Sequence, residues 1–229
     1  MVLRFFLLAV LFLFLSCTSF ERDNPYDPGG VNYDGSSHSV KYGDTIYYEN
    51  EAYATVIIGK QTWFQRNLNY DVSGSKCGNG SSPCTYYGRL YNWATAMALD
   101  AGCNSSSCAS KIKSKHQGIC PENWHIPSDA EWTTLTNYVG GAFTAGKYLK
   151  AENGWNSGNG NNKYGFSALP GGLYSDGSYY VGTKGYWWSA TENGASHAYY
   201  RSMLYYDDDV GRDSYNKGNF LLSVRCVKD

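Results

Sequence analysis

Apolar residues occur in one unbroken run at the start of this 229-residue chain, and afterwards only in short segments between polar, glycine-rich stretches. The first run, Phe5–Leu15, follows Arg4 and ends at Ser16-Cys17, a pattern typical of a secretory signal. It is too short to span a bilayer, which needs about 20 apolar residues. We therefore expect residues 1–17 to be a signal peptide, followed at 18–42 by a flexible tether rich in Pro, Gly and Ser.

In the remaining domain, residues 43–229, β-branched and alternating segments predict antiparallel strands. Asp44–Tyr48 and Ala52–Ile58 come first, and Gly59-Lys60 supplies a turn into Gln61–Phe64, which completes a hairpin. Three later strands are predicted at Tyr186–Thr191, His197–Tyr206 and Phe220–Val227.

Two segments carry helical signals. Asn92–Leu99 is rich in alanine, and its first residue is a suitable N-cap. Asp129–Val139 follows a capping box between Ser128 and Glu131, and Gly140-Gly141 predicts its end. One stripe of this second helix is apolar and should face the core: Trp132, Leu135 and Val139.

Two polar stretches predict loops. Residues 140–163 are dominated by Gly and Asn, and a loop of this length is usually functional or mobile. Arg212–Gly218 is polar enough for an exposed hairpin loop. The expected architecture is α+β, with two short helices, antiparallel strands and long loops.

Cysteine spacing adds disulfides to this architecture. Apart from Cys17, the chain has six cysteines, and an even number in an exported chain favours disulfide bridges. The alternative is a zinc site, which usually has paired ligands at Cys-x₂₋₄-Cys spacing. Here this requirement is only half met, by Cys103 and Cys108. The spacing favours three bridges: Cys77–Cys84, Cys103–Cys108 and Cys120–Cys226.

The net charge of −1 is close to neutrality, and the basic residues are scattered. No basic stripe suggests nucleic acid as a partner. The chain is instead rich in Tyr, Trp, Gly, Asn and Ser, which fits an extracellular, turn-rich domain with aromatic residues in its core.

Few residues suggest chemistry. His125 could act as a general base, but a buried, hydrogen-bonded histidine is the favoured interpretation, and capping explains Glu131 better than catalysis. Asp207, Asp208 and Asp209 could hold Ca²⁺ as hard oxygen ligands, against the simpler interpretation of a solvated turn. No other cofactor is expected.

Aromatic residues gather in the loop-rich second half of the domain. Rings set among Gly, Asn and Ser are suited to stacking on sugars or gripping a protein surface, although they also fill cores. Alternation along a strand turns only one of Trp187 and Trp188 inward. The predicted ligand-binding residues are Trp155, Tyr174, Tyr179, Tyr180, Trp187, Tyr205 and Tyr206.

Several motifs, in order along the domain, resemble the Fibrobacter succinogenes major paralogous domain family. They are Ile58–Trp63, Asn67–Tyr70, Tyr87–Ala96, Cys120–Trp132, Phe166–Gly172, Trp188–Glu192 and Ser223–Asp229. This resemblance implies a core position for Trp188 and leaves Trp187 freer, and it implies no settled activity. Asp23–Pro28 also resembles lipoproteins of such bacteria. The ending Leu15-Ser16-Cys17 is similar to a lipoprotein signal whose cysteine is lipidated, with ordinary secretion as the alternative because Phe14 replaces the usual leucine.

The segment Trp124–Trp132 also resembles a signature of the formylglycine-generating enzyme superfamily, which implies a C-type-lectin-like fold. The oxidase activity of that superfamily needs a closely spaced, copper-binding cysteine pair late in the chain. No cysteine lies between Cys120 and Cys226, so this activity should not carry over.

These observations favour a bacterial lipoprotein, anchored by Cys17 to the outer membrane or cell surface, that binds a glycan or an extracellular protein without catalysis. Its binding face is expected at Asn153–Asn162, Tyr174–Tyr186 and Tyr205–Lys217. An envelope assembly protein is one alternative. An enzyme on the same scaffold is the other, with the candidate residues His125, Glu192, His197 and Asp208.

Overall fold

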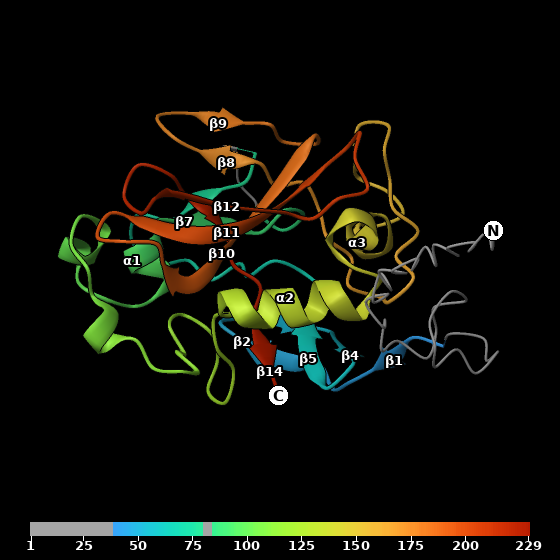
Figure 1. Ribbon diagram of the computed structural model, residues 1–229, viewed down its shortest axis with the longest axis horizontal. Helices are drawn as coiled ribbons and strands as arrows, with labels where there is room; N and C mark the ends of the chain where they lie inside the picture. The colour runs from blue at the N-terminus through green and yellow to red at the C-terminus, as the bar shows by residue number, and fades with distance from the viewer. Residues whose placement is uncertain (1–38, 80–83) are drawn as a thin grey trace, which may run out of the picture.

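The computed structural model describes residues 39–79 and 84–229 (Figure 1). The expected signal peptide, Cys17 and the tether up to residue 38 lie outside the described residues. The last tether residues, Lys41–Tyr42, form strand β1 and pair with β4, so the fold begins slightly earlier than residue 43.

A four-stranded antiparallel sheet is built from the two ends of the domain, in the order β1-β4-β5-β14. The predicted hairpin is confirmed: Val56 lies opposite Trp63, and the turn falls at Gly59-Lys60. On the other side of β5, Val227 pairs with the same Trp63. The strands are β4 (Thr55–Ile58), β5 (Gln61–Phe64) and β14 (Val227–Lys228).

A six-stranded sheet forms the opposite layer, in the order β12-β11-β10-β13-β7-β6. Its long strands are β10 and β11, which pair antiparallel, whereas β13 joins β10 in parallel. The strands are β6 (Lys76–Cys77), β7 (Arg89–Tyr91), β10 (Lys184–Glu192), β11 (His197–Leu204), β12 (Gly211–Asn216) and β13 (Leu222–Ser223). Two small hairpins complete the strands: β2 (Ile46–Tyr48) with β3 (Glu51–Tyr53), and β8 (Leu173–Tyr174) with β9 (Ser178–Tyr179).

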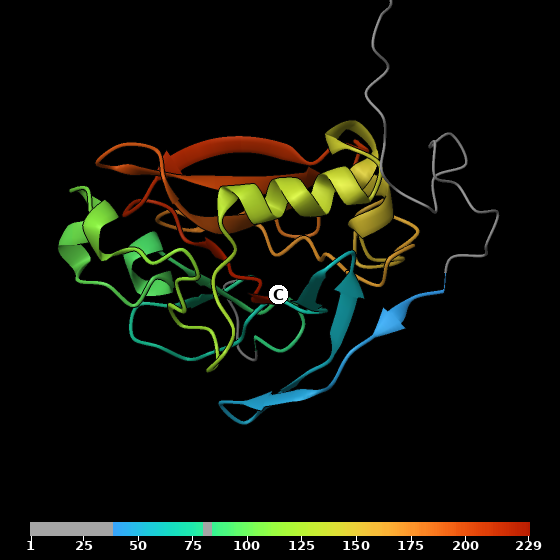
Figure 2. The same cartoon turned by 60° about the horizontal axis from the view of Figure 1, so that its bottom comes forward.

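Helix α2 (Asp129–Tyr138) lies between the two sheets (Figures 1 and 2). Its predicted stripe is confirmed, because Trp132, Leu135 and Val139 are at most 1% exposed. Trp132 contacts Trp63 of the four-stranded sheet and Trp187 of the six-stranded sheet, at ring distances of 4.9 and 6.4 Å. The helix therefore joins the sheets through an aromatic core.

Both predicted helices begin at the N-cap residues that the sequence indicated. Ser128 accepts from the Glu131 backbone N–H, and the Glu131 carboxylate accepts from the Ser128 N–H, so the capping box is present. Helix α1 (Trp93–Ala96) is shorter than predicted and begins at the Asn92 cap. Short 3₁₀ turns, Ala101–Asn104 and Ala109–Lys111, flank the second disulfide.

The prediction of a loop over residues 140–163 is wrong at its start. Helix α3 (Ala142–Leu149) occupies this stretch and buries Ala145 and Leu149 against α2 and the six-stranded sheet. Gly146 obscured the helix in the sequence, since glycine disfavours helices. In the fold this glycine allows a close approach, because a Cβ there would lie 2.6 Å from the Asp208 carbonyl oxygen.

The prediction of a hairpin loop over Arg212–Gly218 is also wrong. Strand β12 pairs with β11 from Gly211 opposite Ser202 to Asn216 opposite His197. The segment is polar because β12 is an edge strand, and edge strands commonly carry polar and charged side chains.

All three predicted disulfides are present: Cys77–Cys84, Cys103–Cys108 and Cys120–Cys226. Together with mostly β structure and few helices, they give the disulfide-stabilised α+β class that the sequence predicted. Within 39–79 and 84–229, none of the helices has the length and apolar character that a membrane crossing requires.

Candidate functional site

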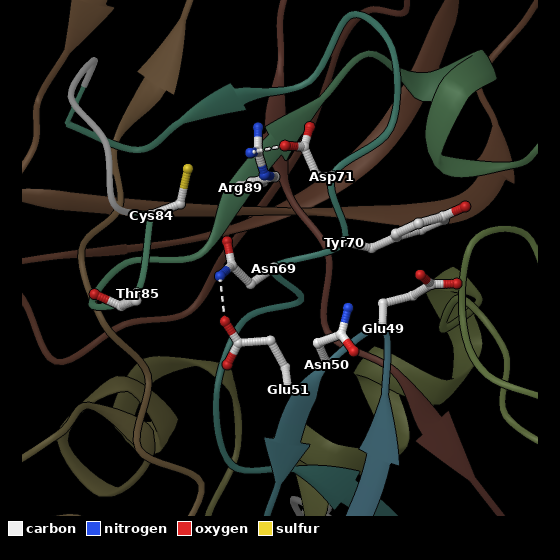
Figure 3. A pocket seen from close by; sticks show the side chains of 9 residues that line it. All are labelled: Glu49, Asn50, Glu51, Asn69, Tyr70, Asp71, Cys84, Thr85 and Arg89. Atoms are coloured by element: carbon white, nitrogen blue, oxygen red, sulfur yellow. Dashed lines mark hydrogen bonds and ion pairs between the residues drawn. The ribbon is translucent and has the colours of Figure 1, made fainter.

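A polar pocket of about 320 Å³ opens between the β2–β3 hairpin and the segment after β5 (Figure 3). The two turn residues Glu49 and Asn50 have φ of 49° and 62°, the left-handed geometry of a tight two-residue hairpin. The Cys77–Cys84 bridge holds the opposite wall. The pocket is lined by Glu49, Asn50, Glu51, Asn69, Tyr70, Asp71, Cys84, Thr85 and Arg89.

Ion pairs and a hydrogen bond from the side-chain amide of Asn69 fix the side chains of the polar pocket. Glu51 accepts from Asn69 Nδ2 at 2.7 Å, and Arg89 donates to Asp71 (Figure 3). Glu51 also accepts from Arg66 at 3.0 Å. The Asn69 Oδ1 atom is buried and has no hydrogen-bond partner among the described residues. A buried, unsatisfied carbonyl oxygen is costly, by about 1–3 kcal/mol.

A second hollow of about 450 Å³ adjoins the polar pocket, and the two share Tyr70 in their walls. Most of its lining side chains are aliphatic or aromatic, beside the polar Ser73, Thr95 and Gln117, and we call it the apolar hollow. The Tyr70 ring meets Tyr48 edge-to-face at 5.5 Å. Burial, and next the charge of Glu49, raise the pKa of Tyr48 to about 12, which keeps its hydroxyl protonated. The hollow is lined by Tyr48, Tyr70, Val72, Ser73, Thr95, Ala98, Leu99, Gln117, Gly118, Ile119 and Cys120. We call the polar pocket and the apolar hollow together the groove.

The predicted aromatic face lies elsewhere, beyond β8 and β9 at the far side of the molecule from β2 (Figure 1). Tyr179, Tyr180 and Tyr206 are 46%, 49% and 66% exposed, while Tyr174 and Tyr205 are partly buried. Lys184 lies 4.1 Å from the Tyr180 ring centre. We call these five tyrosines the tyrosine patch.

Two of the predicted ligand-binding residues belong to the core. Trp187 is fully buried, as is Trp188, so the expectation that Trp187 is the freer ring is wrong. The alternation holds, but both faces of β10 are covered: Trp187 packs on the α2 side, and Trp188 on the opposite side. Trp155 is 4% exposed, and its indole N–H donates to the Ala168 carbonyl oxygen at 3.0 Å.

The acidic turn Asp207–Asp209 has a cation beside it already. The buried ammonium group of Lys150 donates to the carbonyl oxygens of Leu204 and Asp207 at 3.0 and 2.8 Å. Burial lowers the pKa of Lys150, and the nearby Asp208 and Asp207 carboxylates oppose this effect. This lysine already occupies one carbonyl oxygen of the turn that calcium could use. Calcium binding at Asp207–Asp209 stays a prediction.

His125 is buried and hydrogen-bonded, as the favoured interpretation expected. Its Nε2 atom lies 2.6 Å from Glu131 Oε1. Burial opposes ionisation of Glu131, but hydrogen bonds from His125 and Ser128 outweigh it and lower the pKa of this carboxyl group. The capping glutamate is thus also the partner of the histidine, which sequence spacing did not reveal.

The other residues proposed for catalysis have separate settings. Glu192 accepts from the fully buried Lys217 at 2.8 Å and from the Cys108 backbone N–H, which makes it a structural ion pair. His197 and Asp208 are exposed. His125 faces a different hollow, near the end of β14.

Sequence reasoning missed the groove. Its side chains come from a hairpin turn, the segment after β5 and the segment before Cys120, and none of these is unusual alone. The available signals were the Glu49-Asn50 turn and the Asn67–Tyr70 motif, which directly precedes the first disulfide loop.

These features define a disulfide-stabilised α+β domain with an open groove on one side and an aromatic patch on another. The sequence model of the Fibrobacter succinogenes major domain (Fib_succ_major) matches residues 56–228. The chain therefore belongs to this family. Neither a curated protein nor a solved structure matches the chain.

Proposed function

We propose that this protein is an exported, lipid-anchored binding module that holds a glycan chain in the groove without catalysis. The main support for this proposal is the position of Tyr70, which lies between the polar pocket and the apolar hollow and contributes to the walls of both. A sugar has hydroxyl groups at its rim and C–H groups on its faces. Amide and carboxylate side chains can form hydrogen bonds with the hydroxyl groups, and a tyrosine ring can stack on the C–H face.

The charges of the polar pocket support a neutral, hydroxyl-rich ligand. Glu51 and Asp71 are each paired with an arginine, so the walls offer donors and acceptors together. The adjoining hollows also extend the contact surface beyond one sugar unit, which supports a chain-like ligand rather than a monosaccharide.

Anchoring through Cys17 and the C-type-lectin-like fold are parts of the same proposal. The signal-like segment Phe5–Leu15 and the polar stretch after it support a domain displayed on a tether. The pairing of β14 with β5, which joins the two ends of the domain, is compatible with a lectin-like fold. A Cys17→Ala variant should be released from membranes by high salt or carbonate, whereas the wild-type protein should require detergent.

A panel of soluble oligosaccharides tests the binding proposal. Wild-type protein should bind at least one glycan class, and Asn69→Ala should weaken this binding at least tenfold. Asn219→Ala, an exposed asparagine outside the groove, is the matched control. Equal binding by both variants, or no binding by the wild-type protein, would contradict the proposal.

A second candidate contact is the tyrosine patch, supported by the exposure of Tyr179, Tyr180 and Tyr206. Its rings present apolar faces with hydroxyl tips, which suit a protein partner. Binding that survives Asn69→Ala but not Tyr180→Ser would favour the patch.

A further inference from the structure

A third hollow, of about 360 Å³, lies where the end of β14 passes the segment before α2. Two of its lining residues, His125 and Asp229, and the neighbouring Glu131 bring one ligand atom each within 4.8 Å of one another. Among residues 39–79 and 84–229 this is the one such group of three. The third hollow shares no residue with the polar pocket, and of the described residues only Gln117 with the apolar hollow.

We propose that His125, Glu131 and Asp229 form a binding site for a divalent transition-metal ion, with Zn²⁺ as the expected ion. The ligand set is one imidazole nitrogen and two carboxylates, which zinc accepts at bond lengths of about 2.0–2.2 Å. Calcium and magnesium prefer oxygen ligands alone, so the histidine disfavours them. Tetrahedral coordination needs ligand atoms about 3.3 Å apart, so sub-ångström to ångström-scale shifts would bring these side chains into place.

The backbone holds two of these residues in register. His125 and Val227 exchange both backbone hydrogen bonds at 3.0 Å, which places Asp229 two residues beyond a fixed point. The Cys120–Cys226 disulfide locks the same two segments together. The first and last ligands therefore approach each other without the ordering of a loop.

Glu131 is oriented for the same role. Its Oε2 atom accepts from the backbone N–H and the hydroxyl group of Ser128, both at 2.7 Å. The Oε1 atom is left for His125, whose Nε2 atom lies 2.6 Å away. Metal-binding carboxylates are typically held by such outer hydrogen bonds, which fix the ligand before the metal arrives.

Lys115 is a competitor for the site. Its ammonium group pairs with the Asp229 carboxylate at 2.5 Å, although both side chains are well exposed, at 61% and 41%. A metal ion would have to displace this ammonium group. Removal of the lysine should therefore increase metal affinity, whereas a purely structural lysine–aspartate pair predicts no such change.

Equilibrium dialysis of the purified protein against Zn²⁺ tests this site, with the visible spectrum of bound Co²⁺ as a report on coordination. We expect one ion per chain, at least tenfold weaker binding for Asp229→Asn, and severalfold tighter binding for Lys115→Met. His125→Asn should abolish binding. Its circular dichroism spectrum is needed beside it, because the side chain is buried.

Asp208→Asn, in the exposed acidic turn, is the matched control and should bind like the wild-type protein. The proposal is overturned if the wild-type protein holds no Zn²⁺ at 100 µM free ion, or if Asp229→Asn and Lys115→Met both bind as the wild type does. Because no groove residue is changed, failure of this site leaves the glycan test untouched, and the reverse also holds.

Discussion

The groove and the tyrosine patch differ in what their side chains contact. In the tyrosine patch, rings contact other rings: Tyr205 and Tyr206 lie 5.0 Å apart, and Tyr179 and Tyr180 lie 6.3 Å apart. In the groove, polar side chains from distant segments meet around one ring, and the amide oxygen of Asn69 has no partner within the part of the chain that the structure describes. Aromatic content therefore indicates packing in one region, whereas convergence of unlike groups indicates a site in the other.

Loss of the Cys120–Cys226 bridge should have the largest effect, and the groove should suffer most. Replacement of both cysteines by serine should lower the free energy of unfolding by about 4 kcal/mol, because the bridge closes a loop of 106 residues. Cys120 lies in the wall of the apolar hollow. Denaturant unfolding gives the stability, and amide exchange should quicken more at 117–120 than in β10–β12. Uniform quickening would contradict the distinction between the two regions.

Asp129→Asn should loosen strands β11 and β12, which lie outside the groove. Asp129 accepts from Arg201 at 2.6 Å and from Arg212 at 2.9 Å, which pins α2 to β11 and β12. Because Arg201 is 2% exposed, loss of its partner should cost about 3 kcal/mol. Amide exchange should then quicken in β11 and β12, while oligosaccharide binding in the groove should persist. Concerted loss of both would show that the regions are not independent.

The same pair gives a pH dependence. Burial opposes ionisation of Asp129, but hydrogen bonds from Arg212 and Arg201 outweigh it and lower its pKa. The pair therefore stabilises the fold fully above the pKa of an unfolded aspartate, about 3.9, and this stability is lost as the pH falls through the lower folded value. Unfolding measured from pH 6 to pH 2 should show a shallower acid loss in Asp129→Asn than in the wild type. Parallel curves would exclude this pair as a source of acid sensitivity.

Tyr70→Ala should weaken oligosaccharide binding about tenfold, equivalent to about 1.4 kcal/mol, because the ring separates the two hollows of the groove. Tyr70→Phe keeps the ring and is the control, with binding within about twofold of the wild type. Calorimetric titration measures both. An equal loss in the two variants would assign the contact to the hydroxyl group instead.

Tyr179→Ser should have the smallest effect. The ring is 46% exposed, and its hydroxyl group bonds to Asp176 on the surface. We expect less than about 0.5 kcal/mol of stability change and unchanged oligosaccharide binding. Thermal unfolding and titration check the two values, and a clear loss of binding would move the site to the tyrosine patch.

Local signals in the sequence predicted local structure well. The capping box at Ser128 and Glu131 defined α2, and the cysteine spacing gave all three bridges. Tertiary contacts decided the failures: Gly146 weakens α3 in isolation but lets the chain at Asp208 pass close by. The family resemblance left Trp187 freer, but α2, which lies far away in the sequence, covers it.

The candidate sites were less predictable for a related reason. The groove forms because the β2–β3 turn lies beside Asn69. The metal site forms because Asp229 lies beside His125, and about half of the domain separates these two residues in the sequence. No periodicity or spacing within one segment carries this information. The tyrosines were visible because residue type alone marks them, although residue type does not distinguish a core ring from an exposed one.

Hydrogen exchange of the protein with bound oligosaccharide shows whether the groove or the tyrosine patch holds the ligand. The oligosaccharide that binds best in the panel should be added to the wild-type protein at saturation, and protection of each backbone amide should be compared with the free protein. Binding in the groove should add protection at 48–51, 69–73 and 117–120, with none at 176–181 or 205–207. Protection confined to those last two segments would place the ligand on the tyrosine patch and contradict the account.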